Sequence, residues 1–306
     1  MRQPVILRLI RSAARAWWDD DCTRLGASLA YYTLFAIAPI LLVATAISGM
    51  VFGAEAVRGE IVGQLDHLVG REGALAVESL LQGASQRRAG LIATVLGGIT
   101  FIVAATGAFL ELQVALNTIW RVKPRPSGHV RAFVIDRLRS FGLVVAIGFL
   151  LLVSLSVTAA LTALNAWLFG LSPAGFSLWN AASTLVSLVV TTGLFALLFR
   201  FLPDVRLRWR DVTTGAAVTA VLFTIGQQVI GLYLGQSNIA SSYGAAGSMM
   251  ILLLWVYYSC QILLFGAEFT RVYSARHGAK VKPEAFAVKD PLAVNPKSAL
   301  APVSKS

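Results

Sequence analysis

The stretch AGSMMILLLWVYYSCQILLFGA at residues 246–267 decides the fold, because its 22 residues include no charged side chain. About 20 such residues cross the roughly 30 Å hydrocarbon layer of a bilayer as a helix. Five other uncharged apolar stretches of at least 21 residues lie at 29–52, 90–110, 141–169, 178–199 and 212–235. The sequence therefore predicts an all-α, polytopic membrane bundle with six transmembrane helices.

Composition supports a membrane protein over a soluble one. Hydrophobic residues make up 57% of the 306 residues and charged residues 13%, whereas soluble domains carry about a quarter charged residues. The two cysteines, Cys22 and Cys260, are too far apart in sequence to suggest a disulfide framework or a metal site. No cofactor or metal site is predicted.

The basic residues predict the orientation. Segments that would share a side with the two termini contain 22 Lys and Arg residues, and segments on the other side contain 4. The positive-inside rule then places both termini in the cytoplasm of a bacterial inner (plasma) membrane protein. We expect a cytoplasmic amphipathic segment at 1–24, a transmembrane domain at 25–278 with a periplasmic loop at 53–89 that forms short amphipathic helices, and a disordered cytoplasmic tail at 279–306.

The N-terminal segment has the pattern of a helix that lies in the membrane interface. Its apolar residues fall on one helical face, and Arg8, Arg11 and Arg15 fall on the other. The apolar set is Ile6, Leu9, Ile10, Ala13 and Trp17. The three aspartates at 19–21 are then expected to cap the following helix.

Small residues predict where helices approach closely. Gly231 and Gly235 form a GxxxG step in the stretch at 212–235. Such steps let helix backbones come together in a membrane. We therefore expect a tight helix contact at these two glycines.

Polar residues inside or beside the apolar stretches are the candidate functional residues, because they are costly in lipid and tend to face the bundle interior. The candidate polar intramembrane patch comprises Glu268, Gln261, Tyr257, Glu111, Gln113, Asn117, Gln227, Tyr31 and Tyr32. Two interpretations stay open. The residues line a cavity in the cytoplasmic half, or Glu111 and Glu268 form salt bridges at the inner interface with an arginine such as Arg121 or Arg271.

A cationic rim is predicted at the cytoplasmic side. It comprises Arg121, Lys123, Arg125, Arg206, Arg208 and Arg210. Such a rim could gather anionic lipid headgroups, at about 1 kcal/mol for each basic side chain near the surface. The orientation of the chain alone would also account for these charges.

Several runs of residues resemble the YihY/BrkB family of bacterial inner-membrane proteins. They are LAYYTLFAIAP at 29–39, LNTIW at 116–120, LPD at 202–204 with WRDV at 209–212, SYGAAGS at 242–248, LWVYYSCQ at 254–261 and GAEF at 266–269. The resemblance covers residues 16–278. One departure is Gln227, where many members of that family have lysine.

The resemblance implies a six-helix membrane fold without a settled activity. The family has carried the labels ribonuclease BN, virulence factor and transporter, and some members are linked to lipid export. A metal-dependent nuclease needs converging carboxylates or histidines, but His67, His129 and His277 are scattered along the chain. We therefore expect no enzyme and no nucleic-acid partner.

The preferred hypothesis is an envelope-related transporter or flippase-like protein for an amphipathic, anionic lipid-type substrate, with membrane lipids as partners. Two alternatives stay open. One is a non-transporting membrane partner in envelope assembly, and the other is an ion or proton antiporter with Glu268 or Glu111 as its titrating group. The oligomeric state does not follow from the sequence.

Overall fold

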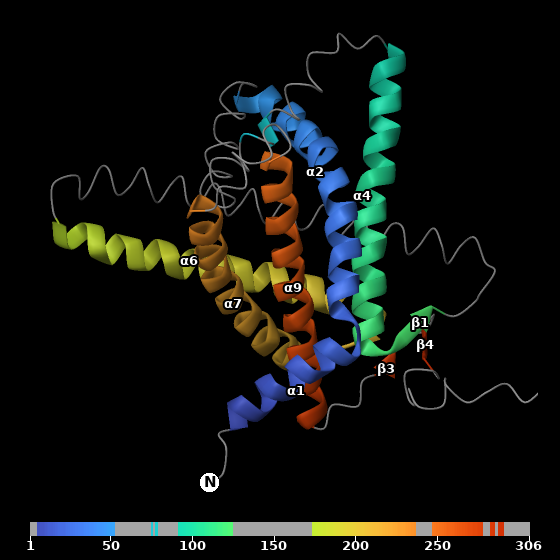
Figure 1. The fold of residues 1–306 in the computed structure, drawn as a ribbon, viewed down its shortest axis with the longest axis vertical. Helices are drawn as coiled ribbons and strands as arrows, with labels where there is room; N and C mark the ends of the chain where they lie inside the picture. The colour runs from blue at the N-terminus through green and yellow to red at the C-terminus, as the bar shows by residue number, and fades with distance from the viewer. Residues whose placement is uncertain are drawn as a thin grey trace, which may run out of the picture. The chain divides into compact units, whose positions relative to one another are not determined.

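The computed structural model describes residues 5–52, 75, 77–78, 91–124, 173–236, 247–277, 282–284 and 287–290. Its described part is mostly helical. The helices are α1 (Val5–Asp19), α2 (Cys22–Phe52), α4 (Leu91–Trp120), α6 (Pro173–Phe201), α7 (Trp209–Gln236) and α9 (Gly247–Arg276) (Figure 1). The predicted membrane span at 141–169 and most of the loop at 53–89 lie outside the described residues.

Three described helices are long and apolar enough to cross a membrane. These candidate spans are Thr184–Phe201, Trp209–Tyr233 and Met249–Arg276. They coincide with the last three predicted membrane stretches. The prediction of six spans and the predicted orientation remain predictions.

The helices run past the apolar stretches from which we predicted them. α4 continues to Trp120 rather than Leu110, and α9 continues to Arg276 rather than Ala267. Residues such as Glu111, Gln113 and Glu268 are helix formers, so nothing in their backbone preferences ends the helix where the apolar run ends. The candidate polar residues therefore lie in helical extensions with fixed side-chain directions.

Two short strand pairs correct the all-α prediction. β1 (Val122–Pro124) pairs antiparallel with β4 (Ala287–Lys289), and β2 (Val205–Arg206) pairs antiparallel with β3 (Lys282–Pro283). The prediction of a disordered tail is wrong for β3 and β4. A segment with little apolar periodicity can still be ordered. Here the tail backbone hydrogen-bonds to β1 and β2 instead of burying an apolar face.

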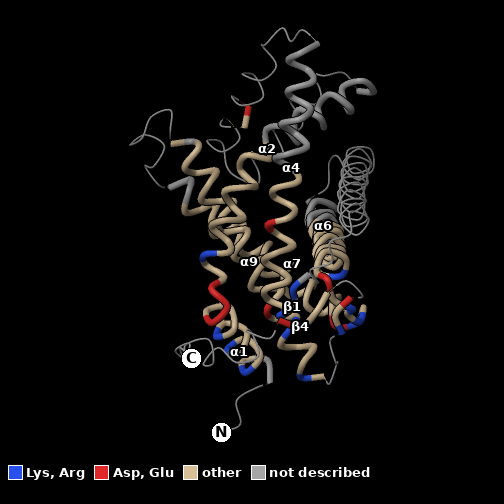
Figure 2. The backbone as a smooth tube through the Cα atoms, turned by 90° about the vertical axis from the view of Figure 1, so that its right-hand side faces the viewer, with Lys and Arg blue, Asp and Glu red and all other residues tan. Residues whose placement is uncertain are grey.

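The chain divides into two compact units. Unit 1 comprises Met1–Asp20, Leu116–Val221 and Phe265–Ser306. Unit 2 comprises Asp21–Ala115 and Leu222–Leu264. Both strand pairs belong to unit 1, and Figure 2 shows Lys, Arg, Asp and Glu residues gathered near α1, β1 and β4.

In unit 1, α7 and α9 pack through reciprocal contacts between glycine and threonine. A Cβ atom added to Gly215 would lie 1.9 Å from Thr270 Oγ1, and one added to Gly266 would lie 2.0 Å from Thr219 Oγ1. Each hydroxyl donates to the carbonyl four residues earlier in its own helix, at 2.8 Å for Thr219 and 2.7 Å for Thr270. We call these four residues the glycine–threonine seam. It fixes the antiparallel register of the two helices.

None of the residues that the structure describes makes the close approach expected at Gly231. A Cβ atom added to Gly231 would meet no atom of the described part of the chain within 4 Å. The GxxxG spacing shows that two glycines share a helix face, but it does not say whether another helix of the chain covers that face. The surroundings of Gly235 lie outside what the structure describes.

α1 is a helix, as predicted, and one side of it packs on α9. Leu9 and Ala13 are buried and form an apolar cluster with Phe269. Ile10, which we placed on the same face, is 42% exposed. The predicted apolar face is therefore divided between a side that contacts the protein and a side that does not.

Unit 2 has an apolar interior. Its larger cluster contains Leu29, Ala30, Val77, Leu252, Val256 and Cys260. A smaller cluster is built on Ile230 and Ile251. α2 also approaches α9 closely, since a Cβ atom added to Gly26 would lie 2.1 Å from Gln261 Nε2.

Candidate functional site

Glu268 lies at the centre of the candidate site. It sits between Gly266 and Thr270 of the glycine–threonine seam, and it is 0% exposed. A fully buried carboxylate is costly unless it is paired or hydrogen-bonded. The carboxylate of Glu268 therefore needs a partner close by.

Arg271 supplies the main partner of Glu268. Its Nη2 and Nε atoms donate to Glu268 Oε2 at 2.7 Å and 2.9 Å. The two residues are three positions apart on α9, so they lie on the same helical face. The ion pair that we left open for Glu268 is therefore present, with Arg271 as the arginine, and its place at the inner interface stays a prediction.

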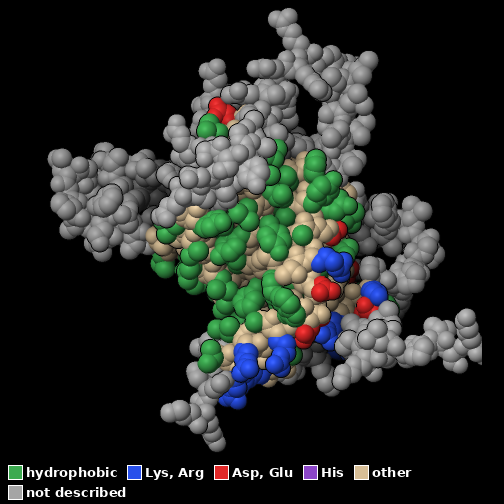
Figure 3. Space-filling model, viewed as in Figure 1, with side chains coloured by type: hydrophobic (Ala, Val, Ile, Leu, Met, Phe, Trp, Pro, Cys, Tyr) green, Lys and Arg blue, Asp and Glu red, His purple; other side chains and the backbone are tan. Residues whose placement is uncertain are grey.

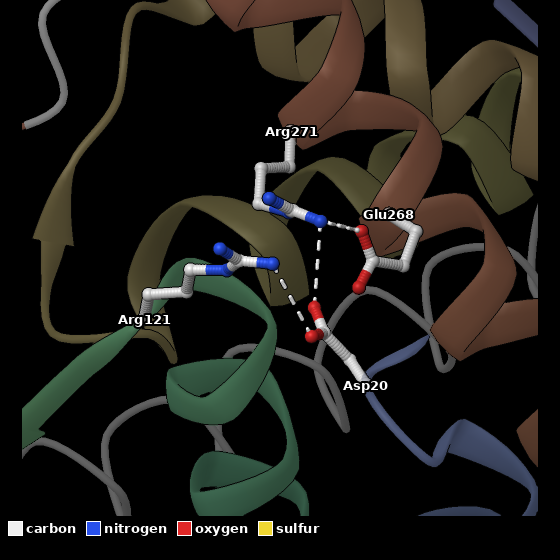
Figure 4. A network of polar contacts seen from close by, with 4 residues as sticks. All are labelled: Asp20, Arg121, Glu268 and Arg271. Carbon is white, nitrogen blue, oxygen red and sulfur yellow. Dashed lines mark hydrogen bonds and ion pairs between the residues drawn. The ribbon is translucent and has the colours of Figure 1, made fainter. Parts of the chain in front are cut away.

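Asp20 joins a second arginine to this pair. Arg271 Nη2 lies 3.4 Å from Asp20 Oδ2, and Arg121 Nη2 lies 3.4 Å from Asp20 Oδ1 (Figure 4). The side chains of Asp20, Arg271 and Arg121 are 14%, 20% and 37% exposed. We call Asp20, Arg121, Glu268 and Arg271 the charge cluster. It brings together three segments that are far apart in the sequence.

The contacts within the charge cluster differ in strength. Charge-assisted N–H···O bonds are strongest near 2.7–2.9 Å, the range of the Arg271–Glu268 contacts. The two contacts of Asp20 are longer, at 3.4 Å. Glu268 therefore fixes the position of Arg271, and Asp20 is the more weakly bound of the two carboxylates.

The second oxygen of Glu268 is oriented toward Asp20 (Figure 4). This oxygen, Oε1, is buried, and it receives no hydrogen bond from any residue that the structure describes. Unsatisfied buried polar atoms are uncommon in proteins. The charge cluster thus combines two guanidinium groups and two carboxylates. One oxygen of the Glu268 carboxylate could accept a further hydrogen bond.

Arg121 is presented by an unusual backbone conformation. It follows the last residue of α4 with φ 55°, in the left-handed region. Glycine is the usual residue at this position after a helix, because a Cβ atom is disfavoured there. Such positions often carry a functional constraint, and here the conformation directs the guanidinium to Asp20.

Asp20 lies in the turn between α1 and α2, where we expected helix-capping aspartates. The neighbouring Asp21 also has a positive φ of 51° and accepts hydrogen bonds from Arg24 N and Leu25 N through its backbone carbonyl. The described side-chain contacts of Asp20 go to the two arginines instead. The local pattern could not reveal this, because both arginines are more than 100 residues away.

A second buried polar contact links the end of α4 to the turn before α7. Asn117 Nδ2 donates to Asp204 Oδ2 at 2.7 Å, and Asp204 N donates to Asn117 Oδ1 at 2.9 Å. The carbonyl of Asp204 accepts from Glu284 N at 3.0 Å. These bonds position β1 and β2 next to the C-terminal strands, so Asn117 has a structural role in unit 1.

The remaining patch residues belong to unit 2. This group consists of Gln261, Tyr257, Glu111, Gln113, Gln227, Tyr31 and Tyr32. Gln261 Nε2 donates to Thr23 O at 3.4 Å. Tyr31 and Tyr32 are 57% and 41% exposed, so they do not line the interior of their unit. Of the nine predicted patch residues, Glu268 and Asn117 are the two that lie in unit 1.

Internal carboxylates neutralise much of the predicted cationic rim. Lys123 Nζ lies 3.0 Å from Asp290 Oδ2, and Arg206 Nε lies 3.6 Å from Glu284 Oε2. Arg121 pairs with Asp20. Arg208 and Arg210 are exposed, and Arg125 lies outside the described residues. Headgroup binding by the rim remains a prediction, with three of its six charges already paired inside the chain.

Sequence reasoning missed Asp20, Asp204 and Asp211 as partners. Asp211 accepts from Ser274 Oγ at 3.3 Å and is buried. One sequence signal for this region was present: GAAVT at 215–219 and GAEFT at 266–270 share the pattern G-A-x-x-T. That repeated pattern marks both sides of the glycine–threonine seam and includes Glu268.

Comparisons with known proteins find relatives that are membrane proteins. Residues 13–290 match the family model described as virulence factor BrkB. A UPF0761 membrane protein of Ralstonia nicotianae is 31% identical over 266 residues, which cover 86% of this chain and 58% of the relative. A UPF0761 membrane protein of Rhodospirillum centenum is 28% identical over 285 residues, 92% of this chain and 60% of the relative.

The chain spans about three fifths of the length of these relatives. A UPF0761 membrane protein of Alcanivorax borkumensis gives a similar result, with 27% identity over 84% of this chain and 58% of the relative. No solved structure matches the chain.

Proposed function

The chain belongs to the virulence factor BrkB family of membrane proteins, and on this premise we propose that it transports or flips an anionic amphiphilic lipid across the bacterial inner membrane. One observation carries the proposal: Arg121, which follows the end of α4, and Arg271 of α9 converge on a single carboxylate, Asp20, at 3.4 Å each. Arginine forks suit phosphate as well as carboxylate. The proposal involves no catalytic reaction.

In this proposal Asp20 occupies the place of the substrate headgroup. A lipid phosphate displaces Asp20 and binds both guanidinium groups. Arg271 keeps its orientation in that exchange because Glu268 binds it at 2.7 Å. Arg121 is 37% exposed, so a headgroup can reach it from outside the cluster. Charged side chains near the membrane are costly, which makes them functional candidates by default.

Purified protein in liposomes that contain a fluorescent anionic phospholipid tests the proposal. We expect the protein to increase transbilayer movement of that lipid relative to empty liposomes. Arg121→Gln should lower the rate on the order of tenfold, since a hydrogen bond to a charged group contributes about 1.5–3 kcal/mol. Arg276→Gln is the matched control, because Arg276 is exposed at the end of α9 and belongs neither to the charge cluster nor to the cationic rim.

Asp20→Asn sharpens the test. It removes the competing charge while it keeps the size of the side chain, so half-saturation should occur at a lower fraction of anionic lipid. The proposal fails if the pure protein moves no labelled lipid, or if Arg121→Gln and Arg276→Gln have equal rates at equal amounts of folded protein. Co-purification of one stable envelope protein without lipid movement would favour the non-transporting alternative.

A proton or ion antiporter is the second candidate, and Glu268 Oε1 favours it. This buried oxygen receives no hydrogen bond from the described residues, so it could accept a proton or an ion. Liposomes with an imposed pH gradient would test this, through collapse of the gradient when sodium or potassium is added. Glu268→Gln should abolish the collapse, and a collapse of the same size with that variant would exclude Glu268 as the titrating group.

We also propose that both termini are cytoplasmic. The proposal rests on the unequal distribution of 22 and 4 basic residues. A reporter that is active only in the cytoplasm should be active when fused after Gly278. A reporter that is active only in the periplasm should be active when inserted at Gly70. The opposite result at both positions would reverse the orientation.

A further inference from the structure

α1 presents two exposed stripes beside the side that packs on α9. Leu7, Ile10 and Trp18 are 49%, 42% and 72% exposed. At 3.6 residues per turn they fall along one side of the helix, away from the buried Leu9 and Ala13. An exposed apolar stripe on a helix that already buries another side indicates a second contact surface.

The arginines of α1 form the adjacent stripe. Arg8, Arg11 and Arg15 recur at intervals of three and four residues, and all three are exposed. Among the residues that the structure describes, no carboxylate forms an ion pair with any of them. They differ in this respect from Arg121, Lys123 and Arg206 of the rim. Figure 3 shows the Lys and Arg side chains beside hydrophobic ones in the region of α1.

The packing of α1 places these stripes at the end of a candidate membrane span. Leu9 and Ala13 pack against Phe269, with Tyr273 at the edge of the same cluster. Both aromatic residues belong to the last part of the span Met249–Arg276. Lipid headgroups lie at the ends of membrane-crossing helices, and tryptophan is enriched at that level.

We infer that α1 is a lipid-contact helix that lies on an anionic bilayer surface, with Leu7, Ile10 and Trp18 in the acyl boundary and the three arginines on lipid phosphates. A helix with adjacent apolar and basic stripes has the composition of interfacial helices. The charge favours an anionic surface over a neutral one, by about fivefold for each arginine. The inference assigns lipid contact to α1 and does not depend on transport.

Site-directed spin labelling of the full-length protein tests the inference. Single cysteines are placed at Ile10, Trp18 and Ser12 in a Cys22→Ala, Cys260→Ala background. The protein is reconstituted in liposomes of phosphatidylcholine with or without phosphatidylglycerol. Ser12 is exposed and lies between the arginine stripe and the buried side, so it is the aqueous control. Collisions with oxygen report lipid exposure, and collisions with a nickel chelate report water exposure.

We expect labels at Ile10 and Trp18 to collide mainly with oxygen in the anionic liposomes, and the label at Ser12 to collide mainly with the nickel chelate. Adding Arg8→Gln, Arg11→Gln and Arg15→Gln should remove the difference between anionic and neutral liposomes. The inference is overturned if the labels at Ile10 and Trp18 are in water in both lipids. It is also overturned if both labels are protected from both reagents, since that result indicates a protein partner over α1. Equal thermal stability of the labelled variants shows that each one is folded.

Discussion

The two compact units differ in what stabilises their helices. In unit 1 Asp20 pairs with Arg121, which follows α4, and with Arg271 of α9, and the glycine–threonine seam joins α7 to α9. In unit 2 the described interior is built on apolar clusters such as Leu29 with Leu252 and Val256. Polar contacts require particular partners at particular distances, whereas apolar clusters tolerate exchange of similar side chains. Single substitutions in unit 1 should therefore distinguish contacts that stabilise the fold from contacts that serve lipid movement.

The largest effect is expected when Glu268 loses its main partner. Arg271→Met keeps most of the side-chain volume but leaves a fully buried carboxylate without its guanidinium. We expect a loss of about 3–5 kcal/mol in the free energy of unfolding, the range for breaking a buried pair. Denaturation in a titration of SDS against mild detergent measures this. Arg208→Met is the exposed control, and equal stability of the two variants would contradict a structural ion pair at Glu268.

The next prediction compares two glycines, one from each unit. Gly266→Ala places a Cβ atom against Thr219 and should cost about 1–3 kcal/mol of unfolding free energy. A Cβ atom at Gly231 meets none of the described residues, so Gly231→Ala should stabilise its helix by up to about 1 kcal/mol. Thermal denaturation of both variants in the same detergent measures the difference.

A double variant checks the cause of the Gly266 effect. Thr219→Gly removes the atoms that the new Cβ would meet, so Gly266→Ala with Thr219→Gly should recover part of the stability lost in Gly266→Ala. No recovery would mean that the cost arises elsewhere in α9. Destabilisation by Gly231→Ala would mean that another surface covers that glycine.

A smaller effect is expected at the backbone of Arg121. Both Arg121→Gly and Arg121→Gln remove the guanidinium from Asp20, but glycine relieves the left-handed conformation at φ 55°. The glycine variant should therefore be more stable than the glutamine variant by about 1 kcal/mol. Both variants should have the same low rate of lipid movement. If the glycine variant moves lipid like the parent, the guanidinium is not part of the transport site.

The smallest effect is expected at the strand pairs. Lys123 is 54% exposed, so its ion pair with Asp290 should contribute less than about 1 kcal/mol. Lys123→Gln should leave the denaturation midpoint nearly unchanged. A much larger loss would show that the β1–β4 pair depends on this contact, and then unit 1 would rely on exposed ion pairs as well as buried ones.

The sequence by itself determined the membrane class, the family and several helices. Long uncharged apolar runs are costly to expose to water. A run such as 212–235 therefore predicts a membrane helix without any knowledge of its neighbours. The sequence also indicated Glu268 as a candidate, because a carboxylate at the end of a membrane-spanning stretch is costly in lipid. These conclusions depend on local composition and short sequence motifs, and they need no knowledge of which residues meet.

Only the tertiary structure decided which residues meet. Asp20 and Arg271 are 251 positions apart, and no local pattern links the turn after α1 to the last part of α9. The same limit applies to Gly231, which no described residue approaches, and to the ordered strands at 282–283 and 287–289. Close approach, ion pairing and strand pairing depend on what lies across the contact, and long-range packing supplies that neighbour.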